Sequence, residues 1–244
     1  MPVTILELLF LGCLLISNSH AGELSFDNNV VLDGFGVNTY VEYYGPVDDS
    51  VGLTEISQNK DWKVIADASE LPHYSQDAYW FRMNLHNNRN RNSVLLLAYE
   101  RPHIGDVAVT QMHGNTIIAQ YQASNQQPVS QRPIISRLFL FPLTVAAQHK
   151  DELFLKVVGR PRDIFKHAKI YEYELGFRIL ERQEGYELTI IGALLVLGIY
   201  NLILYLMLKD RVYLFYVFHV VVIVLLLMAV TGYLSFVLNL PAST

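Results

Sequence analysis

The sequence predicts an all-β jelly-roll or β-sandwich domain followed by an α-helical transmembrane hairpin. Two observations lead to this prediction. Between residues 22 and 175, short apolar or alternating segments recur at roughly ten-residue spacing and are separated by polar turns, as in β-sandwiches and barrels. Residues 188–240 then contain two apolar runs, each of about the twenty residues that a membrane-spanning helix needs or more.

The two apolar runs cover residues 188–208 and 212–240, and only Lys209, Asp210 and Arg211 separate them. A break this short joins two antiparallel helices and leaves no room for a domain between them. Basic residues at a membrane edge favour the cytoplasmic side. Lys209 and Arg211 therefore predict a cytoplasmic hairpin tip, with all preceding residues outside the cytoplasm.

The composition limits the classes of function. The 244 residues are 52% hydrophobic and carry a formal net charge of -5, and no basic stripe is present, which argues against nucleic acid as a partner. About 160 residues lie between the leader and the hairpin, enough for one domain with its own core. The single cysteine, Cys13, lies in the predicted leader. We therefore expect a mature chain with no disulfide and no thiolate site.

Residues 1–21 have the features of an export signal. An apolar run over residues 8–16 leads to Ser19-His20-Ala21, which has small residues at both positions that a signal peptidase requires, and this predicts cleavage before Gly22. The segment before the apolar run contains Glu7 and no Lys or Arg. A retained signal anchor therefore stays open as an alternative to a cleaved signal peptide.

Two segments of residues 22–175 predict strands most clearly. Residues 77–85 alternate, with apolar side chains on one face and Trp80 and Arg82 on the other, which is the period of a half-buried strand. Residues 93–99 are nearly all apolar, as in a strand covered on both faces. Pro142 places the end of its own strand at a sheet edge or bulge. Further strands are predicted at residues 38–44, 107–112, 116–121, 137–143 and 152–158.

Residues 176–187 predict a short amphipathic helical linker that runs into the first membrane helix. Phe177 and Leu180 are apolar, charged residues lie between and after them, and Gly185 is a weak point for a helix. A continuous helix would transmit tilt from the domain to the membrane, whereas a plain tether would not. The sequence leaves both open.

Four segments together carry a family resemblance. Residues 198–219 begin with GIYNL and continue through the charged break into VYLFYVFH, and three further segments precede them: YVEYYGPVDDSVGLTEI (40–56), YWFR (79–82) and QRPIISRLFLFPL (131–143). In order and spacing, the chain resembles the bacterial seven-transmembrane receptors with diverse intracellular signalling modules.

This resemblance implies a periplasmic jelly-roll sensor domain of the second extracellular type, a seven-helix bundle in the bacterial inner membrane and a cytoplasmic effector, often a diguanylate cyclase or a histidine kinase. The sequence ends at Thr244, after the second predicted helix. We therefore expect a truncated receptor without an effector of its own. Either it is a truncated product or fragment, or it works through another subunit, by associating with other copies or with an intact relative.

Candidate ligand contacts follow from the type of domain. Sandwich domains of this kind bind small molecules through aromatic side chains and a few polar groups. We expect Trp80, Tyr121 and Arg137 to bind the ligand, a small molecule such as a carbohydrate. Trp80 has the alternative role of a core aromatic, and Arg82 and Arg137 have the alternative role of structural ion pairs.

Two polar side chains, Asn201 and His219, interrupt the predicted membrane helices. A polar group in hydrocarbon turns towards other helices and finds a hydrogen-bond partner there. Asn201 and His219 would therefore either meet across the hairpin or each pair with a helix that is missing from this chain.

The residues indicate no catalysis. Asp48 and Asp49 are adjacent in a segment typical of a turn, and His103 and His113 flank one strand without the closely spaced partners of a metal site. No phosphate-binding loop or serine elbow occurs. We expect no catalytic residue, no cofactor and no metal, and a membrane-anchored sensor. The alternative is a membrane-anchored, lectin-like binding protein with no signalling output.

Overall fold

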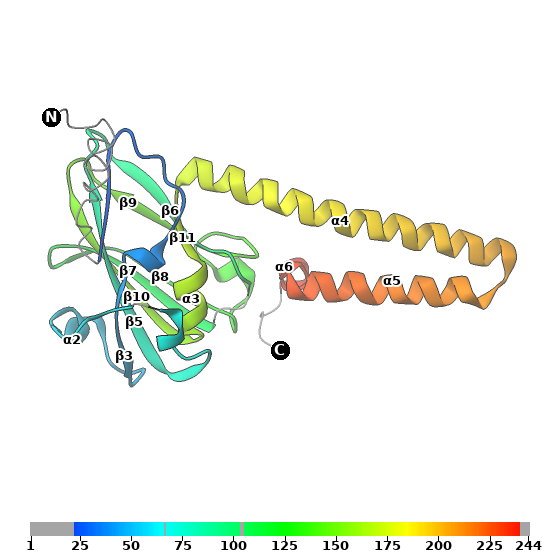
Figure 1. Cartoon of the computed structure of the whole chain (residues 1–244), viewed down its shortest axis with the longest axis horizontal. Coiled ribbons are helices and arrows are strands. Elements are labelled where there is room, and N and C mark those ends of the chain that lie inside the picture. The colour runs from blue at the N-terminus through cyan, green and yellow to red at the C-terminus, as the bar shows by residue number, and fades with distance from the viewer. Residues whose placement is uncertain (1–21, 66, 103–104, 240–244) are drawn as a thin grey trace, which may run out of the picture.

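The computed structural model describes residues 22–65, 67–102 and 105–239, and it consists of a β-sandwich from which a long helical hairpin projects (Figure 1). The predicted leader with Cys13, the predicted cleavage point up to residue 21, and His103 lie outside the described residues. Within the described part, two helices are long and apolar enough to cross a membrane: α4 (Tyr173–Leu208) and α5 (Arg211–Val230). The predicted combination of a β-sandwich and a helical hairpin is therefore confirmed.

The larger sheet, called sheet A below, has the strand order β4-β3-β5-β10-β7-β8, and β1 pairs with β5 in parallel. Along β5, the side chains from Tyr79 to Leu85 enter the main core at every second position, and Trp80 and Arg82 lie on the opposite, outer face. The predicted alternation is confirmed. The strands of sheet A are β1 (Glu23–Phe26), β3 (Glu42–Val47), β4 (Lys63–Val64), β5 (Ser75–Asn87), β7 (Gly105–His113), β8 (Thr116–Ser124) and β10 (Lys150–Gly159).

The smaller sheet, sheet B, has the order β2-β11-β6-β9, built from β2 (Asp33–Gly36), β11 (Ala168–Glu172), β6 (Ser93–Tyr99) and β9 (Phe139–Val145). Strand β6 is covered on both faces, as predicted. Leu95 and Leu97 enter the core between the sheets, and Leu96 packs on the other side with Leu180 of α4. Pro142 lies in β9 at the end of the sheet order, which is an edge position as predicted.

The predicted strand at residues 38–44 is wrong in its first half. Residues Val37–Thr39 form a 3-10 turn, η2, closed by the hydrogen bond from the Tyr40 N–H to the Val37 carbonyl, and β3 begins only at Glu42. Asn38 and Thr39 are residue types that favour turns through local bonding. The remaining short elements are α2 (Leu53–Ser57), η3 (Ala68–Glu70), η4 (Val129–Gln131), α3 (Pro161–His167) and α6 (Tyr233–Leu238).

Helix α4 corrects the predicted boundaries on either side of residue 176. The expected linker and the first membrane helix form one continuous helix that begins at Tyr173, because Gly185 does not interrupt it. A helix of 36 residues is about 54 Å long, and a bilayer core is about 30 Å thick. The first part of α4 therefore lies beside the sandwich, and the open question between a tether and a continuous helix is decided for the helix.

The turn between α4 and α5 is as short as predicted. Lys209 adopts a left-handed conformation with φ of 54°, and Asp210 caps α5 by accepting the Val212 N–H at 3.0 Å. A side-chain cap of this kind satisfies one of the free N–H groups at a helix start. The chain thus reverses direction within two residues, and α5 runs back towards the sandwich (Figure 1).

The second membrane helix is shorter than the predicted 212–240, because α5 ends at Val230. Gly232 follows with φ of +83°, and a Cβ at this glycine would lie 2.5 Å from the Cβ of Pro102 in the sandwich. A glycine in the left-handed region directly after a helix is a frequent stop signal. We missed this signal because apolar residues continue beyond it into α6.

Asn201 and His219 do not meet across the hairpin. The helices pack through an apolar cluster that includes Ile191, Val220 and Val224. The Asn201 amide donates to the Leu197 carbonyl of its own helix at 2.9 Å, and His219 is exposed on α5. The alternative in which Asn201 and His219 contact each other is therefore wrong. Their pairing with further helices stays a prediction.

Candidate functional site

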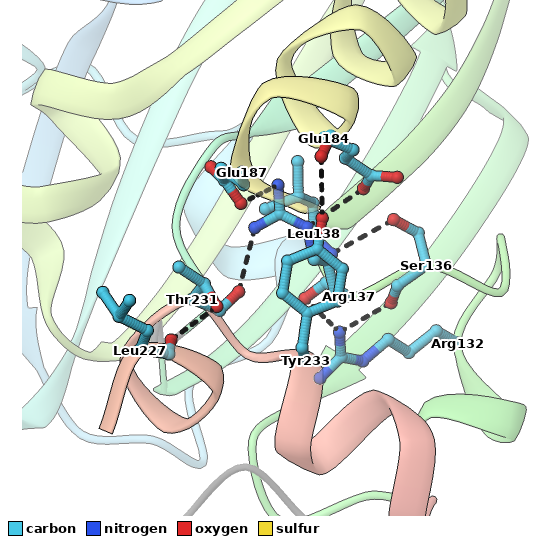
Figure 2. A network of polar contacts seen from close by, with 9 residues as sticks. All are labelled: Arg132, Ser136, Arg137, Leu138, Glu184, Glu187, Leu227, Thr231 and Tyr233. Carbon is cyan, nitrogen blue, oxygen red and sulfur yellow. Dashed lines mark hydrogen bonds and ion pairs between the residues drawn. The ribbon is translucent and has the colours of Figure 1, made fainter. Parts of the chain in front are cut away.

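The sandwich is joined to both membrane helices by one buried side chain, Arg137, from the segment before β9 (Figure 2). Its Nε donates to Glu184 Oε1 of α4 at 3.0 Å, and its Nη1 donates to the Thr231 carbonyl at the end of α5 at 2.9 Å. Its Nη2 forms an ion pair with Glu187 Oε2, also at 3.0 Å. Arg137 of the sandwich thus contacts both α4 and the end of α5.

The local structure explains why this contact forms. Glu184 and Glu187 are three residues apart on α4, so their carboxylates lie on one helix face. The planar guanidinium of Arg137 carries five donors in a fixed fork, which allows it to hydrogen-bond Glu184 and a carbonyl while it forms an ion pair with Glu187. Its central carbon also lies 4.7 Å from the ring centroid of Tyr233, which adds a cation–π contact.

A second buried arginine shapes the segment that presents Arg137. Arg132 Nη1 donates to the carbonyls of Ser136 and Arg137, each at 2.9 Å, and its guanidinium stacks 4.1 Å from the ring centroid of Phe139. Burial lowers the pKa of Arg132 to about 10, so the side chain keeps its charge at neutral pH. Arg132 therefore fixes the backbone on both sides of the Arg137 Cα.

The start of α4 is held separately. Arg89, which is only 4% exposed, donates from Nη2 to Glu172 Oε1 at 2.6 Å at the N-cap of α4. Gly176 lets the first turn approach sheet B, since an added Cβ would lie 2.7 Å from the Cβ of Tyr171. Glu172 and Glu184 lie roughly 18 Å apart along the helix. The sandwich therefore binds α4 at two separate positions, through Arg89 and through Arg137.

The interface between the sandwich and α4 is not completely packed. A cavity of about 170 Å³ lies beside Arg137 and is lined by apolar side chains of the sandwich, α4 and α6, including Leu138, Phe177, Leu180 and Phe236. Side chains around an unfilled volume lose contacts but have room to repack. The junction therefore combines specific charge contacts with an incompletely packed apolar region.

The three predicted ligand residues lie in three different places. Trp80 is on the outer face of sheet A and only 5% exposed. Tyr121 in β8 packs against the main core, with its ring centroid 6.4 Å from that of Phe141. Arg137 is engaged at the junction. These three residues do not come together in the structure, and their role in ligand binding stays a prediction. Strand β8 turns Tyr121 inward, and Gln120 and Gln122 line the cleft beside Trp80 instead.

Sequence reasoning missed Glu184, Glu187 and Thr231 as partners of Arg137. The two glutamates left a signal, since they are spaced three residues apart on a predicted helix directly before an apolar run. Thr231 left none, because its backbone carbonyl makes the contact and any residue supplies a carbonyl.

The side chains considered for catalysis have structural roles. Asp48 accepts the Ser50 N–H at 2.9 Å and its hydroxyl at 2.5 Å, which forms the predicted turn and lowers the pKa of Asp48. Asp49 pairs with Lys156, and His113 Nδ1 bonds the buried Asp151 at 2.9 Å. Among the described residues, no group of three or more His, Cys, Asp or Glu side chains is placed to hold a metal ion.

The structure thus shows a sandwich domain joined by charge contacts to two helices that are long and apolar enough to cross a membrane, an arrangement typical of membrane-anchored domains. Residues 38–162 match the family described as 7TMR-DISM extracellular 2, and residues 183–244 match the family described as 7TM diverse intracellular signalling. The first match spans more than half of the chain, which therefore belongs to the 7TMR-DISM extracellular 2 family. The resemblance inferred from the sequence is confirmed.

Other comparisons add little. No curated protein matches the chain. A solved structure, TmCBM61 in complex with beta-1,4-galactotriose, aligns with 41% of this chain and 63% of its own length, at 7% identity and a TM-score of 0.22. The chain thus spans less than two thirds of that protein. The families place the chain in a membrane, as an extracellular sensor joined to the membrane domain of a signalling receptor.

Proposed function

We propose that the chain senses a small molecule, such as a carbohydrate, in the bacterial periplasm and passes the binding event to helices in the inner membrane. The observation that supports this proposal is the contact of Arg137 with α4 and with the end of α5. A domain that merely hung from its anchor would need no buried charge contact with both helices. The family resemblance implies a diguanylate cyclase or histidine kinase as the effector that receives the signal.

The proposed mechanism is a shift between two arrangements of the junction. Helix α4 is continuous from the sandwich to the hairpin tip, so a tilt at Glu184 is carried along its whole length. A ligand shifts such an equilibrium only by as much as it binds one arrangement better than the other. The ligand must therefore change how the sandwich presents Arg137 to α4 and α5.

The test is a distance measurement between the sandwich and the hairpin in the full chain. With Cys13 replaced by serine, spin labels are attached at the exposed positions Asn115→Cys and Asp210→Cys, and the protein is placed in lipid nanodiscs. We expect a panel of neutral saccharides to contain at least one that shifts the measured distance. Arg137→Ala should abolish this shift without abolishing binding.

Two results decide between this proposal and the membrane-anchored, lectin-like binding protein. Binding of a saccharide with no change in the distance, at saturating concentration, favours the anchored binding protein. A shift that survives in Arg137→Ala contradicts a route through Arg137. The variant Arg182→Ala serves as control, because Arg182 is an exposed arginine on α4, the helix that Arg137 contacts.

The periplasmic orientation has its own test. Single cysteines at Asn115 and Asp210 are treated with a membrane-impermeant thiol reagent in spheroplasts. Because Lys209 and Arg211 favour a cytoplasmic tip, we expect labelling at Asn115 and none at Asp210 until the membrane is permeabilised. Labelling at Asp210 alone in intact spheroplasts would reverse the orientation.

A further inference from the structure

Both tryptophans of the chain, Trp62 and Trp80, belong to one apolar cluster on the outer face of sheet A. The cluster also contains Ile56 of α2, Met112 and Phe154. Within the described residues, each indole N–H is buried and has no hydrogen-bond partner. Folded proteins leave few buried donors unpaired, and such a donor often marks the place of a water or a ligand.

A cleft of about 330 Å³ opens beside Trp80, which is within the usual size of small-molecule sites. One wall is the segment 49–53 before and at the start of α2, and the floor is formed by outward-facing residues of β7, β8 and β10. Gln120 and Gln122 lie on this floor and are exposed. Each amide offers two donor hydrogens and one acceptor oxygen to a bound molecule.

The charged side chains that line the cleft already have partners. Lys156 Nζ pairs with Asp49 Oδ1 at 2.9 Å and lies 5.7 Å from the Trp80 ring centroid. Asp106 accepts a hydrogen bond from the Ser124 hydroxyl. Lys156 and Asp49 compensate each other, and the carboxylate charge that Asp106 keeps disfavours an anionic ligand. The other groups that the cleft presents are amides, the Thr110 hydroxyl and an aromatic ring. This chemistry selects a neutral molecule that carries several hydroxyl groups.

The segment 49–53 beside Trp80 is held by the packing of Val51 and Leu53 on the cluster and by polar contacts of Asp49 with Lys156. Asp49 is 68% exposed in its side chain, so its ion pair with Lys156 is screened by water and adds little stability. A small outward shift of residues 49–53 would uncover the Trp80 N–H from the cleft side. Ligand binding would then offer an acceptor to a donor that the unliganded chain leaves unpaired.

We propose that this cleft is the ligand site of the sensor domain and that it binds a neutral, polyhydroxylated small molecule. The ligand hydroxyls bond the amides of Gln120 and Gln122, and a ligand oxygen accepts the Trp80 N–H once the segment 49–53 shifts. This inference rests on the proposed function, since it assigns a place and a chemical class to the ligand of that function.

Tryptophan fluorescence of the full chain in nanodiscs is the measurement, because both fluorophores lie in this cluster. The probes are D-glucose, D-galactose, D-mannose, cellobiose and lactose, with D-glucuronate and D-glucosamine as charged counterparts. We expect a saturable emission change with at least one neutral saccharide and a much weaker response to its charged counterpart. The double variant Gln120→Ala/Gln122→Ala should raise the Kd about tenfold, as for one to two lost hydrogen bonds.

Two further variants make the assignment specific. Gln126→Ala removes a glutamine on the same chain segment outside the cleft lining, and it should bind like the parent chain. Trp80→Phe keeps an aromatic ring but removes the N–H, so it should both weaken binding and remove most of the emission change. If no neutral saccharide in the panel alters the emission, or if the double glutamine variant binds like Gln126→Ala, the assignment is overturned.

Failure of the site and failure of the proposed function are distinguishable. If a saccharide moves the hairpin but binds the double glutamine variant normally, the ligand site lies elsewhere and the sensing function stands. If a saccharide binds through Gln120 and Gln122 without moving the hairpin, the site stands and the signalling function fails.

Discussion

Replacing Arg137 by alanine is expected to lower the free energy of unfolding of the full chain by about 2–3 kcal/mol. The change leaves Glu184 and Glu187 without their cation and the Thr231 carbonyl without its donor. Breaking a fully buried ion pair costs about 3–5 kcal/mol. The two carboxylates here are 33% and 28% exposed, so water compensates part of the loss.

The measurement is chemical unfolding of the full chain in detergent, combined with the distance between labels at Asn115 and Asp210. In the parent chain we expect one narrow distance distribution. In Arg137→Ala we expect a broad one, because the hairpin loses its contacts with Arg137. Arg137→Lys should give an intermediate result, since lysine keeps the charge but lacks the planar fork. Arg182→Ala should stay within about 0.5 kcal/mol of the parent, as for an ordinary surface change. Parent-like stability and distances in Arg137→Ala would show that the junction does not depend on this residue.

Replacing Gly232 by alanine should destabilise the same junction by about 2–4 kcal/mol for a different reason. Gly232 has φ of +83°, which an L-residue adopts only at a cost, and an added Cβ would lie 2.5 Å from the Pro102 Cβ. Either the turn after α5 changes its conformation or the sandwich moves away. In both cases the Thr231 carbonyl leaves the donor of Arg137.

The matched control is Gly185→Ala on α4. A Cβ added at Gly185 would meet no atom within 4 Å beyond its chain neighbours and the nearby backbone of its own helix, and the residue is exposed in the middle of the helix. Alanine there should stabilise the chain by about 0.5–1 kcal/mol, because it removes the entropic cost of a helical glycine. Chemical unfolding of both variants checks the pair. Equal and small effects at the two glycines would show that the turn at Gly232 is not constrained by Pro102.

The local pattern of the chain was sufficient for most of the secondary structure. In β5, alternation assigned each side chain to the core or to the outer face, because neighbouring residues of a strand point to opposite sides of the sheet. In β6, an unbroken apolar run indicated cover on both faces, although it could not show that α4 provides the second cover. Both signals depend only on residues that are close in sequence.

Where prediction failed, the deciding contact was distant in sequence. Helix α5 ends at Val230 and the following Gly232 lies against Pro102 of the sandwich, whereas the apolar pattern alone continues to residue 240. Tyr121 lies on the core side of sheet A and Trp80 on its outer face. The sequence could not show this difference, because a strand pattern alone does not reveal which face of the strand meets the core. The unpaired indole N–H groups are also invisible in the sequence, since pairing depends on the complete packing around them.

The sequence by itself therefore determined the β-sandwich, the hairpin with its short charged turn and the receptor family, because these depend on hydrophobic period, on the length of apolar runs and on short motifs. Only the tertiary structure decided that α4 is one continuous helix, which the sandwich contacts at Glu172 and at Glu184, and that Arg137 connects it to α5. The Arg137 contacts join residues 47 and 94 positions apart in the chain. No local pattern encodes such a contact, because its energy appears only when folding has brought the sandwich and both helices together and removed water from between them.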